Sequence, residues 1–388
     1  MSTSSISASA PAPTSASASA VRAGPAPAPG DTAAVARARS AAELDAVARA
    51  AIVRARRVRD ARQAAVLLTL GALCFCVLCV SLSLGEVKIP VLTVVRTLFG
   101  ADEGSDGYIV TSLRLPRALT GVLAGAAFGM SGAIFQALLR NPLASPDVIG
   151  ITDGASAAAV IAIVGFGLGG YSVSVIAFVG ALATATLMYL LAWRRGVTGY
   201  RLVLIGIAVG AMLSSVISYV MTISKVYEAR QALGWLTGSL NTKSWDTVRP
   251  LGLAMAVLVP LVLLAGRRLA VLRAGDDVAR ALGVTVERSR LALLLLGVAL
   301  TAVATAAVGP VAFVAFTSGP IARRLVLDGE AAVIPAALVG ALMMTTSDLV
   351  GQHAIPSIDF PVGVVTAIIG APYLLWLLAA TNRTGRGG

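Results

Sequence analysis

The sequence has little charge for its length and few residues of the kinds that bind metals or form disulfides. Of its 388 residues only 13% are charged, whereas about a quarter of residues are charged in soluble domains, so an ordinary soluble domain is excluded. It has one histidine and three cysteines, Cys74, Cys76 and Cys79. The cysteines share one apolar run with no histidine nearby, and we predict neither a disulfide nor a metal site there.

Two further absences narrow the class of function. The chain has no G-x-x-x-x-G-K-[ST] phosphate-binding loop, so we expect that any ATP is bound by another polypeptide. Its apolar runs contain almost no carboxylates apart from Asp153 and Asp348 near their ends. Secondary transporters usually place carboxylates inside the membrane for ion coupling, so that class is the less favoured alternative.

Long apolar runs are abundant instead. Hydrophobic residues make up 57% of the chain, and cutting the runs at charges, glycines and prolines gives ten candidate membrane spans. They lie at roughly 64–84, 116–138, 148–167, 171–192, 202–223, 249–266, 290–309, 311–326, 331–347 and 362–380. The predicted fold is therefore an all-α, polytopic membrane protein of about ten transmembrane helices.

The distribution of arginine predicts the orientation. Net charge is +12, but the basic residues gather in the N-terminal segment and in alternate loops, and the loops after the third, seventh and ninth runs have none. Positive loops mark the cytoplasmic side, so we expect both termini in the cytoplasm. This pattern also makes nucleic acid a poor candidate partner.

Composition divides the chain into three parts. Residues 1–63 form a tail, in which 1–32 are mostly Ser, Ala, Pro, Thr and Gly and are expected to be disordered. The Ala- and Arg-rich part from 33 onward suits either an amphipathic helix on an anionic membrane or a solvated basic leader, and its composition also fits an organellar transit peptide. Residues 64–380 form the transmembrane domain, and 381–388 are a second cytoplasmic tail.

One helix dominates the first half of the transmembrane domain. Its sequence from 115 to 139 is rich in glycine and alanine, and Gly121, Gly125 and Gly129 fall on one stripe at every fourth position. Such a stripe lets another helix approach the backbone closely, so we predict that it packs against a neighbouring helix. The helix follows the motif LRLPR and stops at RNP.

The order of the motifs resembles a known family. LRLPR, the Gly/Ala-rich helix with SGA and Gln136, RNPLASPDVIG, and W-x-x-G-S-L at 235–240 are similar to the membrane subunits of FecCD/vitamin B12-type ABC importers. The resemblance covers about 64–380 and implies the type II importer permease fold. It also implies three kinds of partner: a second permease subunit, identical or unlike, two ATPase subunits, and an external substrate-binding protein. Because the resemblance is to bacterial proteins, it argues against an organellar transit peptide.

The segment from 275 to 283 is the part of the resemblance that bears most directly on mechanism. It reads as a short amphipathic helix that ends at a glycine, and it matches the family's G-(E/D)-x-x-A-x-x-L-G signature. The resemblance implies contacts with the ATPase subunit for Gly275, Ala279, Leu282 and Gly283. A solvated turn is the alternative.

The resemblance also assigns two further sets of residues. Four positions would form a cytoplasmic gate, namely Asn141, Leu143, Gly199 and Tyr200, although Asn-Pro is equally a helix stop. Arg114 and Arg117 of LRLPR would meet glutamates of the binding protein, and Gln352 stands where the family has a third arginine. The alternative for the two arginines is contact with lipid headgroups.

Departures from the family pattern bear on the substrate. Gly319 and Pro320 replace a Pro-His pair, and Gln352 replaces an arginine. These changes resemble the branch that transports catecholate, enterobactin-like ferric siderophores, and in particular the second of two unlike permease subunits. Cobalamin and haem stay open as alternatives. The single histidine, His353, is expected at the surface.

Overall fold

The computed structural model describes residues 29–85, 87–100, 104–147, 149–193, 199–326, 332–355 and 358–384. Within these ranges the regular elements are helices, and one isolated bridge joins Ile355 and Ile358. The chain separates into two units, residues 1–58 and residues 59–388. The predicted all-α class is confirmed.

The first helix, α1 (Pro29–Ser83), is longer than predicted. From 31 to 70 the sequence has no glycine or proline and consists largely of Ala, Arg, Leu and Val, so nothing breaks the helix. The predicted start of the first span at 64 is therefore not the start of a helix, and 29–32, which we expected to be disordered, are helical. Residues 1–28 lie outside the described part. In the first unit, Val47, Ile52, Val53 and Val58 are exposed.

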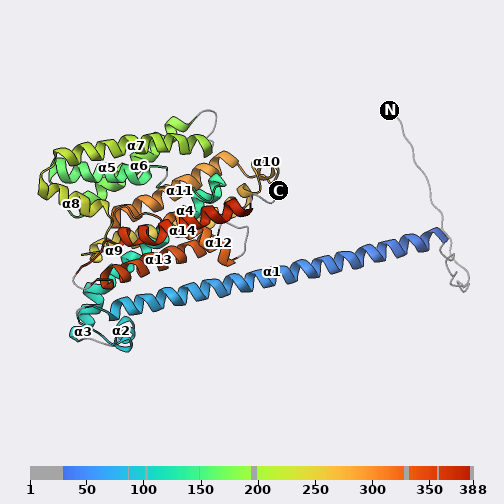
Figure 1. Cartoon of the computed structure of the whole chain (residues 1–388). Helices are drawn as coiled ribbons and strands as arrows, with labels where there is room; N and C mark the ends of the chain where they lie inside the picture. Colours follow the sequence, from blue (N-terminus) through green and yellow to red (C-terminus); the bar gives the residue numbers. More distant parts are fainter. Residues whose placement is uncertain are drawn as a thin grey trace, which may run out of the picture. The chain divides into compact units, whose positions relative to one another are not determined.

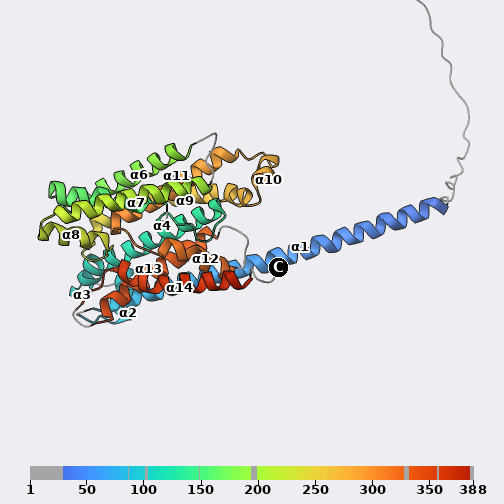
Figure 2. The same ribbon diagram turned by 45° about the horizontal axis from the view of Figure 1, so that its top comes forward.

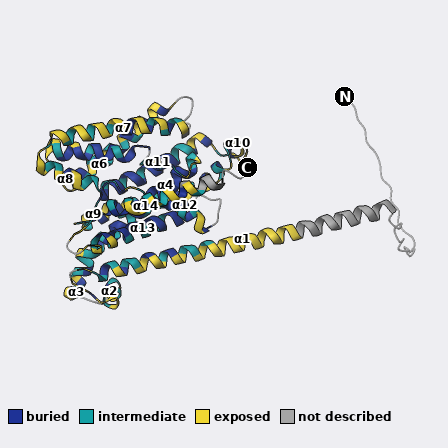
Figure 3. Cartoon of the chain, in the orientation of Figure 1, coloured by how far each residue is buried: buried dark blue, intermediate teal, exposed yellow. Residues whose placement is uncertain are grey.

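The bundle of the second unit is built around α4 (Leu115–Leu139), whose residues are buried for most of its length (Figures 1 and 3). Helices α9 (Trp245–Arg273), α11 (Val286–Val308), α12 (Val314–Val326) and α13 (Val333–His353) pack around it. α14 (Val362–Thr384) packs on α12 and α13. Before α4 the chain forms α2 (Val91–Leu98), α3 (Ser105–Tyr108) and a π-helical turn, η1 (Ile109–Arg114).

A second group of helices packs around α5 (Ile151–Val160), which continues into a π-helical turn, η2 (Ile161–Gly165). Its neighbours are α6 (Tyr171–Ala192), α7 (Gly199–Ile223) and α8 (Val226–Leu236). Helix α11 contacts both groups and so joins them. The short α10 (Asp276–Ala281) and the helix α8 lie at opposite ends of the bundle (Figures 1 and 2).

The glycine stripe of α4 lies against α13. A Cβ atom added to Gly125 would collide with the carbonyl oxygen of Gly340, and one added to Gly129 with that of Ala336. Gly121 faces Leu240 and Thr345 instead. The two backbones therefore approach at a distance that only glycine permits, which places van der Waals contacts of the main chain itself at this interface.

Not all ten predicted spans are equally long. Seven helices are long and apolar enough to cross a membrane, whereas 151–165 and 362–377 form shorter apolar helices. Helix α12 has only 13 residues, contains Pro320, and carries Arg323 and Arg324 in its last turn. The multi-pass membrane class is confirmed, but the described helices confirm fewer full spans than the ten predicted.

Candidate functional site

The segment that was predicted to contact an ATPase forms a separate short helix, α10, between α9 and α11. Gly275 precedes it with φ 120°, and Gly283 follows it with φ 77°, conformations that favour glycine. Asp276 and Asp277 occupy its first turn, where carboxylates interact favourably with the helix dipole. The glycines thus allow a compact helix between two sharp turns.

Helix α10 has one buried and one exposed apolar face. Ala279 is fully buried and packs in the cluster that contains Leu272 and Val286. Leu282 is 66% exposed and Val278 is 46% exposed. The residues of the predicted set therefore divide into an anchor, Ala279, and an apolar surface formed by Leu282 with its neighbour Val278.

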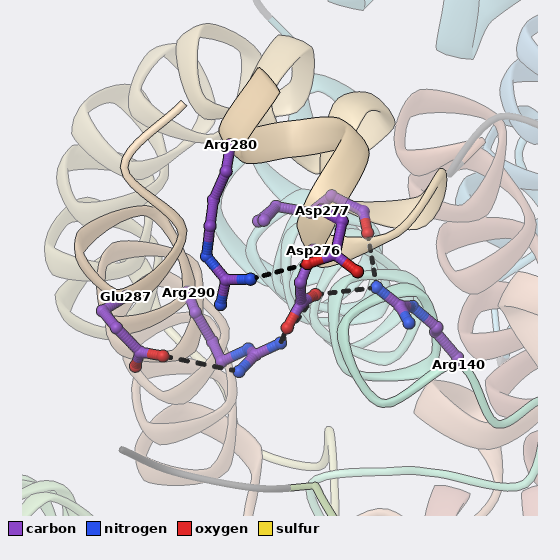
Figure 4. Close-up of polar contacts among 7 residues, drawn as sticks. Arg140, Asp276, Asp277, Arg280, Glu287 and Arg290 are labelled. Atoms are coloured by element: carbon purple, nitrogen blue, oxygen red, sulfur yellow. Dashed lines mark hydrogen bonds and ion pairs between the residues drawn. The ribbon is translucent and has the colours of Figure 1, made fainter. Parts of the chain in front are cut away.

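A network of ion pairs ties α10 to the end of α4 and to α11 (Figure 4). Arg140 Nη2 lies 2.9 Å from Asp276 Oδ1 and donates to the carbonyl oxygen of Leu272 at 2.8 Å. Arg290 Nη2 lies 3.2 Å from Asp276 Oδ2. Asp276 therefore joins an arginine directly after α4 to an arginine of α11, and we call Arg140, Asp276 and Arg290 the α10 ion cluster.

Two surface pairs flank this cluster. Arg280 Nη1 lies 2.9 Å from Asp277 Oδ1 within α10, and Arg290 Nη1 lies 4.0 Å from Glu287 Oε1. Both pairs are between residues three apart on one helix, so they do not connect separate elements. Asp276 pairs with arginines outside α10, whereas Asp277 pairs with Arg280 of α10 itself.

The loop after α4 begins with a reversed backbone conformation. Arg140 has φ 50°, and the next N–H, of Asn141, donates to the carbonyl oxygen of Gln136 at 3.1 Å. The side-chain oxygen of Asn141 accepts the N–H of Leu143 at 2.9 Å, which closes a tight turn around Pro142. The residues that end α4 are thus the same residues that were predicted to form the gate. Arg140 connects this loop to α10.

The second half of the predicted gate lies near Arg140, the residue that directly precedes Asn141. Gly199 is the first residue of α7, and Tyr200 follows with its side chain 82% exposed. A cavity of about 210 Å³ is lined by Tyr200 together with Arg140 and Arg290. The structure therefore brings Tyr200 next to the α10 ion cluster.

The chain then turns back into the bundle. Gly150, with φ 81°, lies against the backbone of Gly206 and Gly210 in α7. Asp147 accepts a hydrogen bond from Thr152 Oγ1 at 2.7 Å, and its burial raises the pKa of this carboxyl group from 3.8 to about 6. This segment therefore carries a carboxylate that no basic group neutralises within the described residues.

A cavity of about 620 Å³ opens beside this segment. Asp147 and Asp153 line it from α5 and the loop before it, and Gly363 and Ala367 line it from α14. Asp153 also points toward Gly210 of α7, where an added Cβ would lie 2.8 Å from Asp153 Oδ2. The cavity thus adjoins α5 and α14.

The residues that were predicted to meet a binding protein lie at the other end of α4 and are engaged within the chain. Arg114 donates to the carbonyl oxygen of Leu82 in the last turn of α1 at 2.8 Å and to that of Val87, just beyond α1, at 2.6 Å. Arg117 forms an ion pair with Asp348 at 2.8 Å, and Gln352 donates to the other oxygen of that carboxylate at 2.8 Å. The structure brings Arg117 and Gln352 together on Asp348 and keeps Arg114 separate.

Sequence comparison identifies the family. Residues 73–380 match the FecCD transport family, which is four-fifths of the chain and falls inside the predicted transmembrane domain. The chain belongs to the FecCD transport family. It is therefore a transport protein rather than an enzyme.

Individual relatives of this FecCD protein agree with that assignment. It is 42% identical over 299 residues, 77% of this chain and 91% of the relative, to the ferric enterobactin transport system permease protein FepG of Escherichia coli (strain K12). It is 38% identical to the probable siderophore transport system permease protein YfhA of Bacillus subtilis (strain 168), over 82% of this chain and 95% of the relative. A solved inward-facing conformation of a putative metal-chelate type ABC transporter matches with a TM-score of 0.71 and 27% identity, covering 82% of this chain and 99% of that one.

One departure from the FecCD pattern has a packing explanation. Gln136 donates to the carbonyl oxygen of Phe316 at 2.9 Å and accepts from Arg323 Nη2 at 2.9 Å. A Cβ atom added to Gly319 would collide with the Gln136 side-chain oxygen. Glycine at 319 therefore makes room for this buried bridge between α4 and α12.

Sequence reasoning missed the partners of several residues that it singled out. Asp276 occupies the acidic position of the α10 signature, and Arg140 directly precedes Asn141, so both were visible as motif neighbours. Arg290 was one of the basic residues in alternate loops that predicted the orientation, and Asp348 was noted only as a carboxylate near the end of an apolar run. Nothing in the spacing indicated that Arg117 and Asp348, 231 positions apart, would pair.

Proposed function

We propose that this FecCD protein is the membrane-spanning permease subunit of an ABC importer that carries ferric siderophores across the cytoplasmic membrane. The observation that supports this most directly is the junction at α10. An exposed apolar surface, Val278 and Leu282, lies on the same short helix as Asp276, which is ion-paired to the start of the gate loop through Arg140. A partner that moved α10 would move Arg140 with it.

In this mechanism ATP stays on a partner. Two ATPase subunits bind α10 of two permease subunits, with Leu282 and Val278 in contact and Ala279 holding the helix to the bundle. Because Asp276 also holds Arg290 on α11, a shift of α10 changes both ion pairs of one carboxylate. The chain needs no cofactor of its own for this step.

The pathway is expected between two permease subunits. Apolar side chains on α7 and α14, including Ile207, Tyr219 and Ile368, are more than half exposed in the single chain. The cavity that adjoins Asp147 and Asp153 lies beside α14 as well. A second permease subunit, the same chain or a sister, would cover these apolar faces and enclose the cavity, with Asn141, Leu143, Gly199 and Tyr200 closing the cytoplasmic exit.

The substrate proposal is a ferric catecholate siderophore. It rests on the enterobactin permease among the relatives and on glycine at 319 and glutamine at 352, with cobalamin or haem as the alternatives. We expect deletion of the gene to lower uptake of radiolabelled iron presented on a catecholate chelate. Unchanged iron uptake with loss of cobalamin uptake would contradict the substrate and leave the importer permease intact.

An external binding protein completes the proposed assembly. It would dock at the end of α4 that carries Arg114, Arg117 and Gln352, opposite to α10. Both termini are then cytoplasmic, as the arginine distribution predicts. Single cysteines test the orientation: Asp277→Cys should react with an impermeant maleimide only from the cytoplasm, and Phe166→Cys only from outside. Labelling of both from one side would contradict it.

A further inference from the structure

A cavity of about 830 Å³ lies at the α8 end of the bundle, and its lining includes neither the α10 ion cluster nor any residue that lines the cavity beside Asp147 and Asp153. Helices α6, α8, α9 and α11 surround it, together with the segment that joins α8 to α9. Its volume falls in the range of about 300–1,000 Å³ that is typical of sites for small ligands. None of the functions proposed above uses it.

The lining of this cavity is divided into a polar and an apolar part. Asn241, Lys243 and Asp246 border it from the start of α9 and the segment before it. Phe178 of α6 and Val303 of α11 border it from deeper within apolar helices. A ligand that filled it would need a charged or polar end and an apolar end.

The two charged side chains at the polar end form no ion pair in the described residues. Lys243 makes no ion pair and no side-chain hydrogen bond in the described residues, and burial lowers the pKa of its ammonium group. Asp246 receives hydrogen bonds only locally, from the hydroxyl of Ser244 at 3.4 Å, and is not ion-paired with Lys243. A partly buried cation without a counter-charge is costly, so a ligand that supplied an anion to Lys243 would be favoured.

Aromatic residues place this end of the bundle at a membrane surface. Tyr171 and Trp235 both border the cavity, and Tyr171 is 66% exposed. Tyrosine and tryptophan are enriched where lipid headgroups meet the apolar layer. The polar end of the cavity therefore lies at headgroup depth and its apolar end at the depth of acyl chains.

We propose that the cavity is a binding site for a phospholipid with a phosphoethanolamine headgroup. The lipid phosphate binds the Lys243 ammonium group, the headgroup ammonium binds the Asp246 carboxylate, and one acyl chain packs against Phe178 and Val303. A lipid with an uncharged glycerol headgroup satisfies Lys243 but leaves Asp246 without a cation and close to a phosphate. The site therefore prefers phosphatidylethanolamine to phosphatidylglycerol.

Trp235 provides a probe inside the cavity. In a variant with Trp193→Phe, Trp245→Phe and Trp376→Phe it is the one remaining tryptophan, and brominated acyl chains quench tryptophan fluorescence on contact. The full chain is reconstituted in bilayers that contain a small fraction of brominated phosphatidylethanolamine or brominated phosphatidylglycerol. We expect quenching by the first at about a tenth of the lipid fraction that the second requires, the ratio that one charge-assisted hydrogen bond gives.

Matched variants test the two charged contacts. Lys243→Gln should remove the quenching at low lipid fraction, and Asp246→Asn should abolish the preference between the two headgroups. Lys225→Gln is the control, because Lys225 lies at the same end of the bundle but is 87% exposed and borders no part of the cavity. Circular dichroism confirms that each variant is folded.

Three results would overturn the proposal. The first is equal quenching by the two lipids in the wild-type background, and the second is unchanged quenching in Lys243→Gln. The third is relief of the quenching by soluble glycerophosphoethanolamine, which would show that a free headgroup rather than a membrane lipid is the ligand.

Discussion

The two ends of α4 each carry an arginine paired with an aspartate, and the two pairs are built for different purposes. Arg117 and Asp348 have side chains that are 20% and 5% exposed, whereas those of Arg140 and Asp276 are 49% and 32% exposed. The first pair joins two helices, α4 and α13, whose backbones already touch along the glycine stripe. The second joins a loop to a short helix. The same chemistry therefore joins two closely packed helices at one end of α4 and joins a loop to a short helix at the other.

This difference affects how binding-protein docking can be tested. Arg114 and Arg117 are the predicted docking residues, yet Arg114 donates to backbone carbonyls at and just after the end of α1, and Arg117 pairs with Asp348. Changing both to glutamate would weaken the bundle as well as any external contact. A loss of binding after that change therefore would not by itself show docking, and the stability of the variant must be measured with it.

The largest expected effect is at the buried pair. Asp348→Ala leaves Arg117 partly buried without its carboxylate and removes the acceptor of Gln352, so we expect a loss of about 3–5 kcal/mol in the free energy of unfolding. Unfolding in mixed detergent micelles, followed by circular dichroism, measures this loss.

A double substitution sharpens this prediction. Arg117→Met combined with Asp348→Ala removes both charges and should cost less than Asp348→Ala alone, because no unpaired charge stays behind. If the loss in the double variant instead equalled the sum of the losses of Arg117→Met alone and Asp348→Ala alone, Arg117 and Asp348 would not depend on each other, and the contrast between the two ends of α4 would fail.

The sequence predicts the parts of this molecule that depend on local pattern. Apolar runs predict the helices, Gly275 and Gly283 predict the limits of α10, and the spacing of Gly121, Gly125 and Gly129 predicts a close helix contact. The predicted span at 64–84 covers only the last part of α1, because the span was placed where the apolar run begins, and the Ala- and Arg-rich residues before it also favour helix.

Long-range pairing could not be predicted in the same way. Arg117 looks like an outward-facing charge in the sequence, because only the packing of α4 on α13 places Asp348 beside it. Arg140 looks like one orientation signal among many until α9 and α11 bring Asp276 and Arg290 around it. In both cases the structural role of the arginine depends on a partner from an element distant in sequence, and hydropathy gives no information about that partner.

The next largest effect on stability is expected for Asp147, a carboxylate that has no arginine partner in the described residues. Asp147 has a hydroxyl partner only, Thr152, and its pKa is raised to about 6 in the folded chain. The folded state thus holds its proton up to about pH 6, whereas the unfolded state loses it near 3.8, so stability falls as pH rises through that window and is constant above it.

Asp147→Asn removes this titration and keeps an acceptor for Thr152. At neutral pH we expect the substitution to raise the free energy of unfolding by on the order of 1–2 kcal/mol. Near pH 3.8, where Asp147 is protonated in the folded chain, we expect almost no gain. Thermal unfolding at the two pH values measures the difference. A gain of the same size at both would show that ionisation of Asp147 is not its cause.

The smallest effect on stability, with a clear effect on transport, is expected for the α10 ion cluster. Asp276→Asn weakens two partly exposed ion pairs, so the cost in unfolding free energy should be about 0–1 kcal/mol and should shrink as salt screens the charges. Because Asp276 connects α10 to Arg140 and Arg290, the same change should reduce iron uptake at least several-fold while the ATPase subunits still bind and hydrolyse ATP.

Asp277→Asn is the matched control, since Asp277 lies next to Asp276, is fully exposed, and pairs only with Arg280 on its own helix. Full uptake by Asp276→Asn, or an equal loss in Asp277→Asn, would show that the connection between α10 and the gate loop does not run through this carboxylate, and the two ends of α4 would then differ in exposure but not in function.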